Sequence, residues 1–168
     1  ASLSGVDVSK NGRCELITVP MCLNLAYNMT SMPNQFEHTT QSEAAAEAHQ
    51  FWALVEFNCA VELKFFLCSM YTPICLPGYA QPIKACRSVC MRARLGCERY
   101  MKKFGFDWPD HMNCDNFPEQ GQASGELCMD PMDAASSTET TRPQTSRPQK
   151  NHNKPSKTHR IQPAKNID

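Results

Sequence analysis

Cysteine is the residue type whose number and spacing in this chain could do the most chemistry. The 168-residue sequence holds ten cysteines, all within residues 1–130. Thiolates that bind zinc cluster at short, repeated spacings, and here only Cys86 and Cys90 lie that close. An even number at irregular spacings favours disulfides, which persist in secreted and cell-surface proteins. We therefore predict a disulfide-bonded domain from an oxidising compartment, with no metal.

Other side chains that could catalyse a reaction do not form a recognisable pattern. The sequence contains no His-Glu-x-x-His motif and no Gly-x-Ser-x-Gly elbow. Fully paired cysteines would also leave no thiol nucleophile. The five histidines are scattered, at His38, His49, His111, His152 and His159. We predict a binding domain without a cofactor rather than an enzyme.

The stretch from Cys59 to Cys97 is the predicted centre of the domain. Six of the ten cysteines lie in it, separated by apolar segments. Cys86, Cys90 and Cys97 are four and seven residues apart, so on a helix they share one face. Met101 and Phe104 extend that face by another turn. Such a helix can be joined by sulfur to three other parts of the chain.

A helix before this centre is predicted to begin at Thr40-Gln-Ser-Glu43, which has the form of a capping box. It carries two apolar stripes at helical spacing, where one is enough to pack on a small core. The second stripe is either additional core or a surface for a partner. The first stripe is Ala44, Ala48, Phe51 and Val55, and the second is Gln50, Ala53, Leu54 and Phe57.

Further elements follow from local pattern. Residues 14–22 are β-prone and are stopped by Pro20. Residues 61–71 predict a short helix, and residues 83–104 predict a longer one that Trp108-Pro109 ends.

The two ends differ from the cysteine-bearing part. Residues 1–13 are predicted to be a flexible N-terminus, and residues 14–130 to be the domain. Residues 131–168 contain five prolines but no cysteine, glycine or aromatic residue, which predicts a disordered linker. Seven basic and three acidic residues give that linker a net charge of +4, against −4 for residues 1–130. This distribution does not favour nucleic-acid binding.

The chain is expected to pass through the secretory pathway. Asn28-Met-Thr30 is an N-glycosylation sequon in a polar stretch, and we expect Asn28 to carry a glycan. No apolar run is long enough to span a membrane. The sequence begins with neither Met nor a signal-peptide pattern, so we interpret it as a trimmed ectodomain.

The cysteine spacing resembles that of a known family. The gaps between successive cysteines are 8, 37, 9, 7, 11, 4, 7, 17 and 14 residues, and together with the residues between them they resemble the Frizzled cysteine-rich domain. Pro33-Asn-Gln-Phe36, Lys64-Phe-Phe66 and Pro118-Glu-Gln-Gly121 look most like the Frizzled five and eight subgroup. Other matching segments include Tyr27-Asn-Met-Thr30, His49-Gln-Phe-Trp52, Leu67-Cys-Ser-Met-Tyr71, Cys86-Arg-Ser-Val-Cys90, Phe106-x-Trp-Pro109 and Leu127-Cys-Met129.

The resemblance implies a mostly helical, disulfide-rich fold with about four helices and short β-strands. It covers roughly residues 14–130 and leaves out the linker. By cysteine order it also implies five disulfides, Cys14–Cys75, Cys22–Cys68, Cys59–Cys97, Cys86–Cys128 and Cys90–Cys114.

The same resemblance implies a function, binding of Wnt proteins at two places. One is an apolar groove for the palmitoleoyl chain carried by Wnt, and the other is a patch that meets a Wnt loop. The implied groove residues are Gln50, Phe51, Ala53, Leu54, Phe57, Met101, Phe104 and Phe106. The implied patch residues are Phe36, Phe65, Met70 and Tyr79.

This sequence departs from the subgroup at the groove. Ala53 stands where the subgroup has proline, and Phe57 stands where it has an aliphatic residue. Residues 44–48 are rich in alanine, and the last cysteine gap is one residue longer. Phe57 is the departure expected to narrow the groove.

We interpret the chain as the Wnt-binding ectodomain of a receptor on the extracellular face of the plasma membrane. Membrane attachment is expected beyond the C-terminus, and a fatty acid is expected to be able to bridge a homodimer. The alternatives are a secreted Frizzled-related antagonist, the corresponding domain of Smoothened or of a receptor kinase, a fatty-acid or sterol carrier, and an adhesion module whose second stripe is core.

Overall fold

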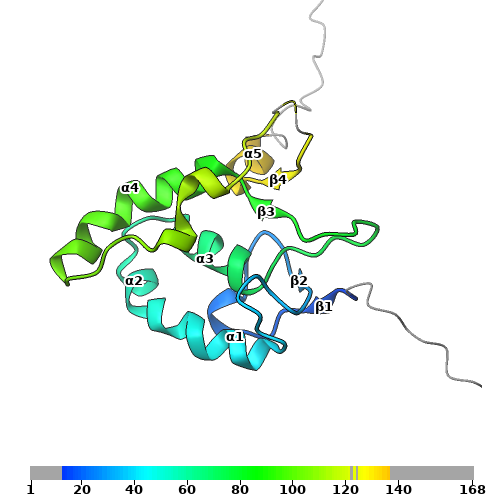
Figure 1. The fold of residues 1–168 in the computed structure, drawn as a ribbon, viewed down its shortest axis with the longest axis horizontal. Helices are drawn as coiled ribbons and strands as arrows, with labels where there is room; N and C mark the ends of the chain where they lie inside the picture. The colour runs from blue at the N-terminus through cyan, green and yellow to red at the C-terminus, as the bar shows by residue number, and fades with distance from the viewer. Residues whose placement is uncertain (1–12, 122, 124, 137–168) are drawn as a thin grey trace, which may run out of the picture.

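The computed structural model describes residues 13–121, 123 and 125–136. The predicted flexible N-terminus therefore lies outside the described residues except for Arg13, and so does the linker from residue 137 onward. The described chain forms helices that pack around α3 (Leu63–Tyr71), together with two small two-stranded sheets. Figure 1 shows α3 between α1 (Gln41–Ala48) and α4 (Arg87–Lys103), and α3 contacts both.

Helix α3 is the centre of the core. Every residue of it except Lys64 is buried, because its apolar side chains meet other elements on all sides. Phe66 stacks on Trp108, with ring centroids 6.0 Å apart, and also contacts Phe117. The helix begins at Leu63, two residues later than predicted, after a turn at residues 61–62.

The predicted capping box at the start of α1 is confirmed. The Glu43 N–H donates to the Thr40 hydroxyl, and the Glu43 carboxylate accepts from the Thr40 N–H. Hydrogen bonds from the backbone and hydroxyl of Thr39 hold the pKa of Glu43 below its usual value. The helix then breaks at the 3-10 turn His49–Phe51, continues as α2 (Trp52–Phe57) and ends at Asn58, which is left-handed. The break falls within both predicted stripes, since Ala44 and Ala48 lie on α1 whereas Val55 and most of the second stripe lie on α2.

Helix α4 is shorter than predicted at its N-terminal end. Ile83 forms a bridge with Ile74, and β3 (Lys84–Ala85) pairs in parallel with β4 (Cys128–Met129), so residues 83–86 are extended. This pairing is made with residues more than forty positions away, which local helical periodicity does not report.

The other end of α4 also differs from the prediction. Gly105 adopts a φ of +82°, and the Phe106 N–H closes the helix end by donating to the Met101 carbonyl. Glycine therefore ends the helix before Trp108-Pro109, and Trp108 packs in the core. Met101 is buried with the cysteine face as predicted, but Phe104 is 75% exposed and does not extend that face.

The N-terminal strand is also shorter than predicted. Within residues 14–22 only β1 (Glu15–Leu16) is a strand, and it pairs antiparallel with β2 (Met29–Thr30). Pro20 begins a 3-10 turn that ends at Cys22. Figure 1 places both small sheets at the side of the molecule away from α2.

All five disulfides have the pairing that the resemblance implied. Three of them join the face of α4 and its N-cap to distant segments, as the spacing of Cys86, Cys90 and Cys97 predicted. The bonds are Cys14–Cys75, Cys22–Cys68, Cys59–Cys97, Cys86–Cys128 and Cys90–Cys114.

The start of the predicted linker is ordered. Residues Pro131–Ser136 form α5, so the prediction of disorder from residue 131 is wrong for these six residues. Asp130, which precedes α5, accepts from the Met132 N–H and from Arg92 and Ser88 on α4. These hydrogen bonds of Asp130 attach the start of α5 to α4.

Candidate functional site

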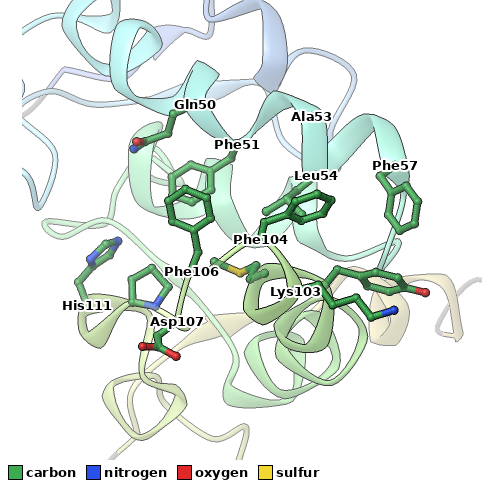
Figure 2. Close-up of a pocket in the computed structure, with 13 residues that line it drawn as sticks. Gln50, Phe51, Ala53, Leu54, Phe57, Lys103, Phe104, Phe106, Asp107 and His111 are labelled. Atoms are coloured by element: carbon green, nitrogen blue, oxygen red, sulfur yellow. The ribbon is translucent and has the colours of Figure 1, made fainter.

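A groove of about 860 Å³ lies between α2 and the end of α4 with the loop that follows it. Figure 2 shows side chains entering it from both walls. Most of its lining is apolar. Its lining residues are Gln50, Phe51, Ala53, Leu54, Phe57, Tyr100, Met101, Lys103, Phe104, Phe106, Asp107, Pro109 and His111.

The structure brings together all eight residues predicted to line a groove. The second apolar stripe forms one wall, and Met101, Phe104 and Phe106 belong to the other. Phe57 is 59% exposed, and Ala53 is exposed while Leu54 is partly buried. Of the two interpretations of that stripe, additional core is therefore wrong, and the stripe is surface.

Local backbone geometry explains why the walls converge. The 3-10 turn at residues 49–51 turns α2 away from the direction of α1, while Ala44 and Ala48 remain buried. On the opposite wall, Gly105 reverses the chain after α4 so that the residues on either side of it, Phe104 and Phe106, both reach the groove. Buried Met101 contributes to the apolar lining between them.

The polar lining lies mainly at the two ends of the groove. Figure 2 shows Gln50 and His111 at one end, and the Lys103 ammonium near Phe57 at the other. Sequence reasoning missed five lining residues, Tyr100, Lys103, Asp107, Pro109 and His111. The helical spacing from Tyr100 to Lys103 and Phe104 could have indicated the first two, whereas the last three lie in an irregular loop with no periodic signal.

The Phe57 end carries an ordered aromatic pair. The Phe57 and Tyr100 rings meet edge to face, with centroids 4.8 Å apart. Arg99 lies over the Tyr100 ring at 4.7 Å and donates to its hydroxyl, and the Lys103 ammonium lies 5.8 Å from the ring centroid. Cations over an aromatic face stabilise this arrangement.

Behind the other end, Tyr71 connects the groove to the core. Its ring lies near Phe51 and Phe36, and its hydroxyl donates to the Glu47 carboxylate. Burial raises the pKa of Tyr71, and the charge of Glu47 adds to this effect. The phenol therefore stays protonated and keeps its hydrogen bond over the physiological pH range.

The four residues predicted for a second contact patch do not share an exposed surface. Phe65 and Met70 are 5% and 2% exposed because they lie on α3 in the core. Phe36 packs on Tyr71 with ring centroids 4.8 Å apart, and only Tyr79 is well exposed. The assignment of Phe65 and Met70 to a contact surface therefore has to be corrected, since a buried side chain offers little area to a partner.

The apolar lining of the groove suits a long apolar ligand more than a polar substrate.

Among the described residues, no group of three or more His, Cys, Asp or Glu is placed to hold a metal ion. No helix in the same part of the chain is long and apolar enough to cross a membrane.

These features define a helical cysteine-rich domain with a surface groove, and the chain belongs to the Fz domain family, whose model matches residues 14–121. It is 53% identical to human (Homo sapiens) Frizzled-5 over 140 residues, which are 83% of this chain and 24% of that protein. It is 58% identical to mouse (Mus musculus) Frizzled-8 over 122 residues, 73% of this chain and 18% of that protein. The chain thus spans about a quarter or less of the curated relatives it matches.

A solved structure with a similar chain path is the cysteine-rich domain of Smoothened. The match has a TM-score of 0.48 and 26% sequence identity, and it covers 66% of this chain and 97% of that one.

Proposed function

We propose that this chain is the extracellular ligand-binding domain of a Frizzled-type receptor. Its ligands are Wnt proteins, and the groove between α2 and the end of α4 takes the palmitoleoyl chain that a Wnt carries. Membership of the Fz family and the identity to Frizzled-5 and Frizzled-8 support the receptor assignment. The observation that carries the lipid assignment is the exposed apolar groove itself.

The groove has the chemistry that an acyl chain requires. Phe57, Phe104 and Phe106 expose aromatic area that a soluble domain would otherwise bury. Transfer of about ten methylenes from water, at ~0.8 kcal/mol each, supplies ~8 kcal/mol before the costs of ordering the ligand are subtracted. Such binding depends on shape and area and needs few polar contacts.

Binding to a Wnt with and without its lipid tests this proposal. The domain would be immobilised and exposed to an acylated Wnt and to the same Wnt with its acyl-bearing serine changed to alanine. We expect strong binding to the first and a large loss with the second. Equal binding to both would contradict a lipid role for the groove, and binding to neither would favour a carrier of free fatty acid or sterol.

The proposal includes the cellular location, the membrane attachment and the dimerisation of the receptor. The receptor lies on the extracellular face of the plasma membrane, is attached to it beyond the C-terminus of this chain, and forms a homodimer when a fatty acid bridges two grooves. A secreted antagonist would bind the same Wnt without membrane attachment. Expression of the full-length protein followed by surface labelling distinguishes these two.

Glycosylation of Asn28 is part of the same proposal. Asn28 is exposed and directly precedes β2. The Thr30 hydroxyl that completes the sequon is buried and has no hydrogen-bond partner among the described atoms. An unpaired buried hydroxyl is unfavourable for the fold, which supports a role for it in sequon recognition before folding. Intact-mass measurement before and after glycosidase treatment tests this.

A further inference from the structure

The aromatic pair Phe57–Tyr100 lies at one end of the groove, and this pair has no packing role in the core. Phe57 is exposed at the last position of α2, and the partly buried Tyr100 belongs to the last turns of α4. Their rings, 4.8 Å apart, join the two walls. Between the other lining residues, the described structure has no comparable ring contact across the groove.

Two cationic side chains also contact Tyr100. Arg99 contacts its ring face at 4.7 Å and its hydroxyl at 2.9 Å, and the Lys103 ammonium lies 5.8 Å from the ring centroid. A side chain fixed by several neighbours forms a firmer boundary than a free rotamer, because displacing it breaks all of these contacts. The pair is therefore placed to stop a chain that extends along the groove.

We propose that Phe57 and Tyr100 form an end wall that sets the length of acyl chain the groove accepts. This inference rests on the proposed binding of an acyl chain. The terminal methyl group lies against the two rings, and the end that is attached to the rest of the ligand lies toward Gln50 and His111. Lys103 beside the wall makes the space beyond it unfavourable for further apolar carbons, since a charged head needs water.

A length series of acyl chains provides the test. The probes are one serine-containing peptide esterified with straight chains from octanoyl to stearoyl, titrated by calorimetry against the intact domain. Each methylene that fits should strengthen binding by about fourfold. For the unaltered protein we expect this gain to stop at one chain length, beyond which longer chains bind no better.

Variants of the wall separate a length limit from a general contact. Phe57→Ala and Tyr100→Ala should move the stopping point to longer chains, because the space that the removed ring occupied opens to further methylenes. Tyr100→Phe keeps the ring and should keep the original stopping point. Leu95→Ala, on the exposed side of α4 outside the groove, is the control.

The outcomes are distinguishable. Continued gain through stearoyl in the unaltered protein, or an equal loss at every chain length in Phe57→Ala, would overturn the end wall while leaving acyl binding intact. Failure of every chain to bind a correctly folded domain would overturn the proposed acyl binding and the end wall with it. Thermal unfolding of each variant shows whether the fold is retained.

Discussion

Gly96 of α4 lies directly against the backbone of Cys59, and the next residue along the helix, Cys97, is bonded to that same cysteine. A Cβ on Gly96 would overlap the Cys59 carbonyl oxygen and would lie 2.8 Å from the Ala60 Cβ. The close approach of the two backbones is therefore possible only with glycine, and it brings the two sulfur atoms within bonding reach.

Gly96→Ala should destabilise the domain by about 1–3 kcal/mol, because backbone rather than a flexible side chain has to move. In an open helix the same change would be stabilising by up to about 1 kcal/mol. Denaturant unfolding of the oxidised protein measures the difference, with Leu95→Ala on the neighbouring exposed position as a control expected within about 0.5 kcal/mol. A gain in stability for Gly96→Ala would contradict the close approach.

Phe57→Glu should weaken ligand binding about thirtyfold or more without unfolding the protein. The side chain is more than half exposed, so a carboxylate there remains in water, but the groove loses about 2 kcal/mol or more of apolar contact, roughly thirtyfold in affinity. Binding to an acylated Wnt and thermal unfolding are measured together.

Leu95→Glu is the matched control for that change. Leu95 is 84% exposed on α4 and does not line the groove, so the same charge there should leave both binding and stability nearly unchanged. An unfolded Phe57→Glu protein would contradict the assignment of the second stripe to the surface.

Asp130→Asn should weaken the attachment of α5 to the domain. Burial raises the pKa of Asp130, but hydrogen bonds from Arg92, Ser88 and the Met132 N–H outweigh that effect, so its pKa lies below the usual 3.8. Loss of the charge should cost about 1–2 kcal/mol at neutral pH, at the low end for a charged hydrogen bond because Arg92 is partly exposed.

The same carboxylate predicts a pH dependence of stability. Because its pKa is lower in the folded than in the unfolded protein, its contribution is complete above the unfolded value and is lost as the pH falls through the folded value, below about pH 4. Denaturant unfolding at a series of pH values should show a decline there that is smaller in Asp130→Asn. Equal declines in the two proteins would assign the acid sensitivity to other groups.

Thr40→Ala should destabilise α1 by about 1 kcal/mol, because the Glu43 N–H loses its side-chain acceptor at the helix start. Ser42→Ala removes a hydroxyl two residues further on, at an exposed position inside the helix, and should be neutral or slightly stabilising. Hydrogen exchange of the α1 amides reports the local change. Similar effects from both variants would mean that the cap contributes nothing specific.

Several features of this protein were determined by the sequence itself. The number and spacing of the cysteines were enough to indicate disulfides and, through resemblance, the family and the pairing of the sulfur atoms. The capping box at Thr40 is a local pattern, so it was predictable without tertiary information. The resemblance implied eight of the groove residues, and four of these also form the second apolar stripe of the helical pattern.

Other features were decided only by tertiary structure. Residues 83–86 have helical periodicity but are extended, because β3 finds its partner in distant β4. The resemblance implied that Phe65 and Met70 belong to a contact patch, but they lie in the core, because α3 is covered on all sides. The meeting of Phe57 with Tyr100 likewise joins residues from two helices. Local sequence reports the propensity and the periodicity of a helix or strand. Which face of that element becomes buried depends on contacts with segments far apart in the chain. Those contacts exist only once the disulfide-bonded core has formed.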